Sequence, residues 1–356
     1  MQSRDNLCKL GYTIQMTKLL KECEIDFAAT IIKRGGTVAF RTETVYGLGA
    51  DATNDEAVQK IFVAKGRPQS NPLIIHFASL GHLLEYFPGL DAKTRHLFKR
   101  LVHAFAIVLP KPEKSRISSV ALAGLDTVAV RIPSCKYARK FIRACGVPLA
   151  APSANTSSRP SPTRWQDAYD DLNKRIDAIL MGKQTNYGVE STVAMFTQTK
   201  KPGLMILRQG GIDAKKLAKR TGFDVEVASG ADLKRSPGTV HKHYAPSVPV
   251  YVIAPKAGET KEQFNTRLSD FTSGKAVAVM CLTHHKRRYK GYKVIPLGFN
   301  ASMVKRNLFA GLREAEKYLV KSYEGEKAII AVALPEKVEY ACPIERLEKS
   351  SEGRKI

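Results

Sequence analysis

Several familiar signatures are missing from this 356-residue sequence. Its six cysteines are scattered and form no C-x-x-C pair, which argues against a zinc ribbon and a disulfide framework and favours a reducing compartment. The patterns G-x-x-x-x-G-K-[ST] and G-x-G-x-x-G are absent, so neither a P-loop nor a Rossmann fingerprint explains a nucleotide site. With no H-E-x-x-H motif and no acidic cluster, the sequence predicts no metal held by protein side chains.

Long apolar runs and acidic residues are also scarce. No run reaches the length of a membrane span, and the first residues contain no apolar segment followed by a cleavage site. We therefore expect a cytoplasmic protein without a membrane partner. The 33 acidic residues face 57 Lys and Arg, which gives a formal net charge of +24. Such a charge attracts RNA, DNA or nucleotides but does not say which of them is bound.

The length and the pattern along the chain predict two α/β domains. A helix is predicted over "TNDEAVQKIFVAKG" (53–66), with a capping box of Thr53 and Glu56 and a C-terminal cap at Gly66. The glycines of "YGLG" suggest a turn. The strand candidates of this part are "TVAF", "PLIIHF", "FAIVLP", "TVAVRIP", "PLAAP", "STVAMF" and "LMILRQ".

A segment rich in Gly, Pro and Ser, residues 229–249, has little periodicity and is predicted to be a linker. Beyond it, strands and helices alternate, which favours a small α/β domain with a mostly parallel sheet. Its predicted elements are the strand "VYVIAP", a helix near 259–272, the strands "AVAVMCL" and "YKVIPL", a helix over 300–322, the strand "AIIAVAL" and a short helix from Pro343.

Some residue types stand out against these patterns. Arg131 lies in the apolar strand "TVAVRIP", and a buried charge needs a partner, which is either a protein carboxylate or the carboxylate of a ligand. Lys65 and Arg67 suit a triphosphate, but basic residues at a helix end also simply complement the helix dipole. His76, in an apolar strand, is a candidate ligand contact or a satisfied core residue.

Small polar residues form a second group of candidates. Thr42, Glu43 and Thr44 follow a predicted strand, where ligands of α/β proteins are often bound. The loop "AAPSANTSSRPSPT" (150–163) offers compact hydrogen-bonding groups and an open backbone for an anion. Each signal is weak by itself, because turns and flexible loops have similar compositions.

Taken together and in this order, the motifs resemble the threonylcarbamoyl-AMP synthase family, the YrdC-like enzymes of N6-threonylcarbamoyladenosine formation at position 37 of tRNA. The segments that carry the resemblance are "TETVYGLGAD" (42–51), "KGRPQSNPLIIH" (65–76), "TVAVRIP" (127–133), "APSANTSSRPSPT" (151–163), "ESTV" (190–193), "LRQGG" (207–211) and "SPGTVHKHYAP" (236–246). The last of them matches the longer, two-domain form of the family.

The resemblance implies a fold and domain limits. An N-terminal YrdC-like domain, with a twisted mixed sheet and helices, is expected over residues 19–225, after an extension over 1–18. A linker that covers the active site is expected over 226–248. The rest of the chain, 249–356, is expected to form a smaller Rossmann-like α/β domain.

It also implies a reaction and its residues. L-threonine, bicarbonate and ATP would give threonylcarbamoyl-AMP and pyrophosphate, with Mg²⁺ accompanying ATP, and a tRNA threonylcarbamoyltransferase would receive the product. Catalysis is assigned to Lys65 and Arg67. ATP binding is assigned to Lys65, Arg67, Asn71, Thr127, Ser153, Asn155, Ser161, Arg208 and Tyr244. L-threonine binding is assigned to Thr44, His76, Arg131, Ala151 and Ser191.

The sequence departs from the family in three places. Arg41 stands where the family usually has Pro, residues 101–106 replace a "WPGPLT"-like turn, and Gln209 replaces the Pro of "LRPGG". Contact with tRNA or double-stranded RNA is a further expectation. An RNA-binding module with impaired catalysis is the alternative function, and the linker and the lack of zinc-finger cysteines argue against a related carbamoyl-transfer factor.

Overall fold

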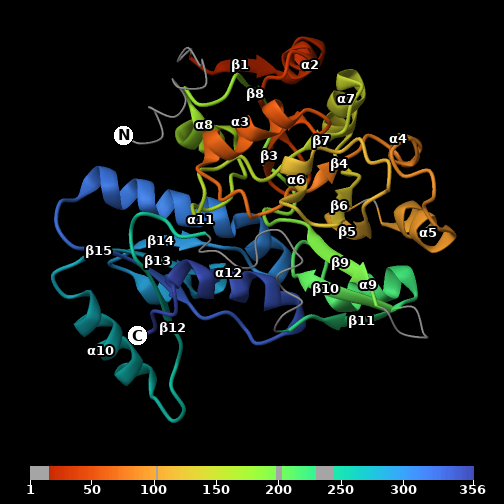
Figure 1. Cartoon of the computed structure of the whole chain (residues 1–356). Helices are drawn as coiled ribbons and strands as arrows, with labels where there is room; N and C mark the ends of the chain where they lie inside the picture. Colours follow the sequence, from red (N-terminus) through yellow and green to blue (C-terminus); the bar gives the residue numbers. More distant parts are fainter. Residues whose placement is uncertain (1–15, 102, 198–202, 230–243) are drawn as a thin grey trace. The chain divides into compact units, whose positions relative to one another are not determined.

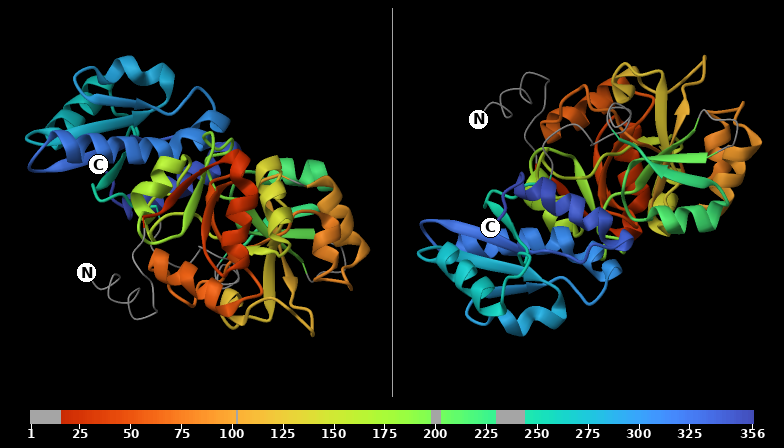
Figure 2. Two further views of the ribbon diagram at one scale, coloured as in Figure 1. Left: turned by 90° about the horizontal axis from the view of Figure 1, so that it is seen from above. Right: turned by 90° about the horizontal axis from the view of Figure 1, so that it is seen from below.

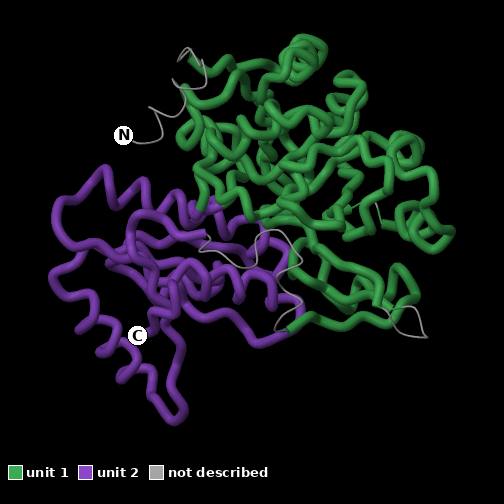
Figure 3. Tube along the Cα trace, viewed as in Figure 1, with its two compact units in different colours: residues 1–157, 161–241 green, residues 158–160, 242–356 purple. Residues whose placement is uncertain are grey.

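The computed structural model describes residues 16–101, 103–197, 203–229 and 244–356. The chain divides into two compact units (Figure 3). Unit 1 comprises residues 1–157 and 161–241, and unit 2 comprises residues 158–160 and 242–356. The predicted linker over 226–248 lies largely outside the described residues, so its limits and its cover over the active site stay predictions.

Unit 1 is built on an eleven-stranded mixed sheet with the order β1-β8-β2-β3-β7-β4-β6-β5-β9-β10-β11 (Figure 1). Its strands are β1 (Lys18–Lys21), β2 (Val38–Arg41), β3 (Tyr46–Asp51), β4 (Ile75–His76), β5 (Phe105–Pro110), β6 (Thr127–Arg131), β7 (Leu149–Ala150), β8 (Ala178–Met181), β9 (Thr192–Phe196), β10 (Gly203–Arg208) and β11 (Asp224–Val227). Its α-helices are α2 (Ile25–Lys33), α3 (Asp55–Lys65), α4 (Leu80–Leu84), α5 (Ala92–Arg100), α6 (Ser119–Leu122), α7 (Lys136–Cys145), α8 (Trp165–Leu172) and α9 (Ala214–Thr221).

All seven predicted strands of this part are present. Strand β3, however, occupies the "YGLG" segment that the glycines had suggested to be a turn. A Cβ on Gly49 would lie 2.9 Å from a ring carbon of Phe40, so the glycine lets the ring of the neighbouring strand pack across β3. The glycine serves close packing here rather than a change of chain direction.

Helix α3 confirms the predicted helix but corrects its cap. Asn54, not Thr53, is the N-cap, and its Oδ1 accepts a hydrogen bond from the N–H of Ala57 at 3.0 Å. Thr53 instead bonds to Asp51. At the other end, Gly66 has the predicted left-handed conformation, with φ 59°.

Unit 2 has a four-stranded, wholly parallel sheet with the order β12-β15-β13-β14. Helix α11 packs on β13, β14 and β15 (Figure 2). The elements are β12 (Val250–Ile253), α10 (Lys261–Thr272), β13 (Ala276–Cys281), β14 (Lys293–Pro296), α11 (Ala301–Ser322), β15 (Lys327–Val332), α12 (Ala341–Ser351) and the short 3₁₀ helices 283–289 and 338–340. The predicted small α/β domain is confirmed, and no described helix has the length and hydropathy of a membrane span.

Candidate active site

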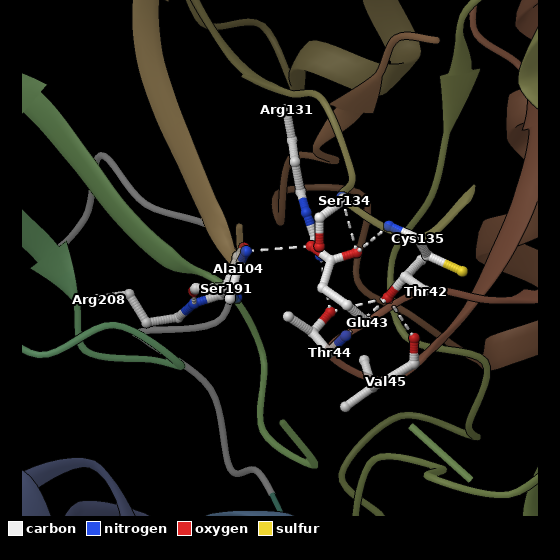
Figure 4. Close-up of polar contacts among 10 residues, drawn as sticks. All are labelled: Thr42, Glu43, Thr44, Val45, Ala104, Arg131, Ser134, Cys135, Ser191 and Arg208. Carbon is white, nitrogen blue, oxygen red and sulfur yellow. Dashed lines mark hydrogen bonds and ion pairs between the residues drawn. The ribbon is translucent and has the colours of Figure 1, made fainter. Parts of the chain in front are cut away.

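Polar groups from separate turns and loops meet around Arg131, at the end of β6 (Figure 4). Its Nη2 donates a hydrogen bond of 3.0 Å to Oγ1 of Thr44 and forms an ion pair of 2.5 Å with Glu43. Both acceptors lie in the short turn between β2 and β3. Arg131 is only 4% exposed, and its Nε is buried without a hydrogen-bond partner among the described residues. Of the two alternatives for Arg131, the structure therefore shows the protein carboxylate, whereas contact with the carboxylate of a ligand stays a prediction.

The carboxylate of Glu43 organises the surrounding backbone. Its Oε1 accepts the N–H of Ala104 at 3.0 Å, and its Oε2 accepts those of Ser134 and Cys135 at 3.1 and 3.3 Å (Figure 4). Cys135 is the N-cap of α7, so the carboxylate also lies at the positive end of that helix dipole. Glu43 thus joins Arg131, the start of β5 and the start of α7.

Glu43 stays ionised despite its burial. Burial raises the pKa of a carboxyl group, but the charge of Arg131 and the hydrogen bonds outweigh it and lower the pKa of Glu43 below its ordinary value. A negative charge is therefore fixed beside Arg131. The guanidinium keeps its orientation because two acceptors hold the same nitrogen.

His76 lies on β4, directly opposite Arg131 in the parallel pairing of β4 and β6. Its Nδ1 is 3.0 Å from the carbonyl oxygen of Ile74, so Nδ1 carries the proton and Nε2 is the acceptor. Burial, followed by the charge of Arg131, lowers the pKa of His76 to about 3. The imidazole is therefore neutral at physiological pH. It lies next to Arg131, whose positive charge is already compensated by Glu43.

Lys65, the last residue of α3, is almost fully buried, and its ammonium binds the small-residue loop. Its Nζ donates to the carbonyl oxygens of Ser153 and Asn155, and its own carbonyl accepts the N–H of Ser157 at 2.8 Å. The structure therefore brings together three predicted nucleotide residues. It adds a loop-holding contact that sequence reasoning had not assigned to Lys65.

Arg67 and Asn71 form a second contact of the predicted set. The guanidinium donates to Oδ1 of Asn71 at 2.5 Å and to the carbonyl oxygens of Asn71 and Pro72 at 3.1 and 2.9 Å. These hydrogen bonds join the two ends of the turn over residues 67–72. Arg67 is thereby held beside the C-terminal end of α3, where Lys65 also lies.

Arg208 and Ser191 connect the predicted nucleotide residues with the predicted threonine residues. Nη2 of Arg208 donates to the carbonyl oxygen and to Oγ of Ser191, at 2.9 and 3.2 Å. The glycines that follow Arg208 permit a close approach, because a Cβ on Gly210 would lie 2.3 Å from the nitrogen of Thr192. The replacement of the family's Pro by Gln209 leaves both glycines in place.

The remaining predicted residues are placed less centrally. Ala151 donates its N–H to Ile74 at 3.0 Å, next to His76, and Ser161 donates to Glu190 at 2.5 Å. Thr127 begins β6, about 13 Å along an extended strand from Arg131. Tyr244 is buried within unit 2.

Tyr244 has a packing role in the described structure. Its ring stacks on Phe309 with centroids 5.0 Å apart, and the guanidinium of Arg346 lies 4.9 Å from the ring centroid. Its φ of 67° is unusual for a residue other than glycine. That this ring covers the nucleotide stays a prediction, and the contacts within unit 2 give it no support.

Two departures from the family pattern have structural explanations. Arg41 forms an ion pair of 2.9 Å with Glu22 and stacks its guanidinium 5.1 Å from the centroid of Tyr137, so it fits its place. In the altered turn, Ala104 takes φ 44°, donates to Glu43 and accepts the N–H of Thr192 at 2.8 Å. Ala104 therefore takes a left-handed conformation without being a glycine.

Among the described residues, no group of three or more His, Cys, Asp or Glu side chains could hold a metal ion. Two acidic residues of this region are already engaged, Glu43 by Arg131 and Glu190 by Ser161. Mg²⁺ bound with ATP stays an expectation drawn from the resemblance.

Comparison with known proteins shows the family to which the chain belongs. The model of the Sua5–YciO–YrdC family, described as "Telomere recombination", matches residues 30–210. A second, described as "Threonylcarbamoyl-AMP synthase, C-terminal domain", matches residues 207–351. A threonylcarbamoyl-AMP synthase of Pyrococcus abyssi is 36% identical over 96% of this chain and 98% of its own length. The chain belongs to the threonylcarbamoyl-AMP synthase family.

Other members give the same result. A Bacillus subtilis threonylcarbamoyl-AMP synthase is 35% identical over 94% of both chains. The crystal structure of P. abyssi Sua5 complexed with L-threonine superposes with a TM-score of 0.83 at 35% identity, over 96% of this chain and 99% of that one. The two-domain fold expected from the resemblance is thus confirmed by family members over nearly their full length.

Sequence reasoning missed several contacts of the candidate site. It placed Glu43 among the polar residues after a strand but did not pair it with Arg131. The pairing could have been inferred from the sequence, because two opposite charges that are both expected to be buried are expected to form an ion pair with each other. The backbone donors of Ala104 and Ser134 left no signal, because their role depends only on where the chain turns.

Proposed function

We propose that the protein is an L-threonylcarbamoyladenylate synthase, a nucleotidyltransferase that forms threonylcarbamoyl-AMP and pyrophosphate from L-threonine, bicarbonate and ATP. Membership in the family gives the reaction. The observation in the structure that supports it most is the buried guanidinium of Arg131, held by Glu43 and Thr44 with one donor left over. Such a group fits the carboxylate of an amino acid.

The threonine end of the site follows from this group. We assign the substrate carboxylate to Arg131 and its amine or hydroxyl group to His76, whose neutral Nε2 accepts a hydrogen bond. A neutral imidazole adds no second positive charge beside Arg131. Thr44, Ala151 and Ser191 would shape the rest of this pocket. A threonine site is supported by the P. abyssi relative, whose crystal structure is of a complex with L-threonine.

The nucleotide end is assigned to the residues around Lys65. Its ammonium bonds to the loop carbonyls of Ser153 and Asn155, which favours a dual role in which it shapes the loop and adds positive charge near the phosphates. Arg67, on its closed turn, would supply the second charge. Positive charge there stabilises the pyrophosphate that leaves.

In the reaction we propose, the attacking atom belongs to the substrate. The threonine amine takes up CO2 derived from bicarbonate and forms a carbamate. A carbamate oxygen then bonds to the α-phosphorus of ATP, and the bond from that phosphorus to the bridging oxygen breaks to release pyrophosphate. The protein holds the two reactants in line and excludes water, so no side-chain nucleophile is needed. The magnesium ion expected with ATP would add charge neutralisation.

A pyrophosphate assay tests the proposal. Release should require ATP, L-threonine and bicarbonate together, in the presence of Mg²⁺, and Arg131→Met should raise the KM for threonine far more than the KM for ATP. Lys65→Ala should abolish release. Release of no pyrophosphate with all three substrates would contradict the proposal. In that case RNA binding with a steep salt dependence, and without protection by ATP and threonine, would favour the RNA-binding alternative.

A further inference from the structure

The loop that contains Ser153 and Asn155 runs through both units. After Ser157 the chain leaves unit 1, contributes residues 158–160 to unit 2, and returns to unit 1 at Ser161. The residues on either side of this excursion, Asn155 and Ser161, belong to the proposed ATP-binding set. Contacts that fix residues 158–160 therefore also restrict the conformation of the neighbouring residues 155–161, because these are joined to them by the backbone.

Helix α11 of unit 2 fixes residues 158–160 with two buried side chains. Glu316 forms a two-pronged ion pair with Arg159, with distances of 3.1 Å from Nη1 to Oε1 and 2.7 Å from Nη2 to Oε2. One turn before Glu316, Arg313 donates from Nε and Nη2 to the carbonyl oxygen of Pro160, at 3.1 and 2.5 Å. Charge-assisted bonds of this geometry are strong and directional.

The same carboxylate also holds the last residues of the predicted linker. Oε1 of Glu316 accepts both the N–H and the hydroxyl of Ser247, each at 2.6 Å. Close by, the N–H of Ala245 donates to the carbonyl oxygen of Ser158 at 2.8 Å. One side chain thus joins two segments that lie far apart in the sequence.

The backbone of Ser158 is an independent sign that this segment is held in one conformation. Its φ is 73°, in the left-handed region that residues other than glycine seldom adopt. Such a conformation costs energy and persists only where the surroundings determine it. The contacts of Glu316, Arg313 and Ala245 supply those surroundings.

We propose that Glu316, assisted by Arg313, is a positioning residue for the nucleoside triphosphate. By fixing residues 158–160, it sets the conformation of the loop between Asn155 and Ser161 and keeps that loop ready to bind ATP. This inference rests on the proposed function for its ligand, but its structural part can be tested without activity.

The test compares Glu316→Gln and Arg159→Ala with a matched control, Glu259→Gln. Glu259 forms a similar two-pronged ion pair with Arg267 in unit 2, where both residues are only half-buried, but has no contact with residues 158–160. Arg159→Ala leaves the bonds of Glu316 to Ser247 intact, so it isolates the link to the loop. Being partly exposed, Arg159 also provides a variant that folds if Glu316→Gln does not.

Steady-state kinetics and hydrogen exchange give the readouts. Glu316→Gln and Arg159→Ala should each raise the KM for ATP at least about fivefold with the KM for threonine unchanged, and the double variant should be no worse than the worse single one. Amide exchange in residues 151–163 of the ligand-free protein should accelerate in both variants. The control should match the wild type in both measurements.

A KM for ATP within about twofold of the wild type, or a rise shared by the control, would overturn the inference. If the wild type released no pyrophosphate, the proposed function would fail, and exchange in residues 151–163 would still decide whether Glu316 positions the loop. Unchanged exchange in both variants would refute that role.

Discussion

Replacing Glu43 by Gln tests whether the buried ion pair with Arg131 supports the site. The amide keeps the shape of the carboxylate, but it leaves the charge of Arg131 buried without compensation. Removing one partner of a buried pair costs about 3–5 kcal/mol. Most domains have a total stability of about 5–15 kcal/mol, so Glu43→Gln should remove a large share of it.

Chemical denaturation at pH 7 measures this cost. Glu22→Gln is the control, since Glu22 pairs with Arg41 in a more exposed place and should contribute less than about 1 kcal/mol. If the cost of Glu43→Gln arises from the unpaired charge, adding Arg131→Gln should cost less than the two single changes added together. A Glu43→Gln variant within 1 kcal/mol of the wild type at pH 7, the same as the control, would refute the reasoning.

The pH dependence gives a second check on Glu43. Its pKa is lowered in the folded state, so its contribution is present above the unfolded value, about 4.3, and is lost as the pH falls through the native value. The difference in free energy of unfolding between wild type and Glu43→Gln should therefore shrink below about pH 4.3. A constant difference through that range would contradict the lowered pKa.

Three further predictions concern single residues. Burial lowers the pKa of His76 to about 3, so its imidazole should show no NMR titration between pH 8 and 5. Because it stays neutral in the fold, the free energy of unfolding should fall by up to about 1.4 kcal/mol per pH unit below about pH 6.5. Gly210→Ala would press a Cβ on the backbone of Ser191 and should lower the free energy of unfolding by about 3 kcal/mol or more, as measured by denaturation. Gly66→Ala has open space around it and should lower that free energy by only about 1–2 kcal/mol, through backbone strain. Tyr244→Ala should lower the melting temperature through a loss of about 3–5 kcal/mol, and an unchanged melting temperature would show that its ring is not packed as described.

Local patterns predicted most of the fold, because they report which residues are buried. The apolar stripe of α3 and the runs of β5, β6 and β9 gave the elements directly. Strand β3 was not predicted. Gly49 is needed there for packing against Phe40, and the sequence alone does not distinguish a glycine needed for packing from a glycine needed for a turn. The N-cap of α3 was misplaced by one residue because Thr53 and Asn54 are both good caps.

The site was predicted as a set of residues but not as a set of contacts. Motif order led to Lys65, Ser153 and Asn155, yet their mutual hydrogen bonds depend on a loop folding back over a helix end. That residues 158–160 belong to unit 2 left no local trace at all. Contacts between positions more than a hundred residues apart, such as Arg159 and Glu316, follow from tertiary packing alone.

The central claim concerns the reaction, and tracing the carbon of bicarbonate tests it most directly. The purified protein, given ATP, L-threonine, Mg²⁺ and ¹³C-labelled bicarbonate, should form a product whose mass combines AMP, threonine and one labelled carbonyl carbon, together with pyrophosphate. The label should be absent from the product when threonine is left out. Release of pyrophosphate with no labelled adenylate, or a threonyl adenylate without the label, would contradict the account.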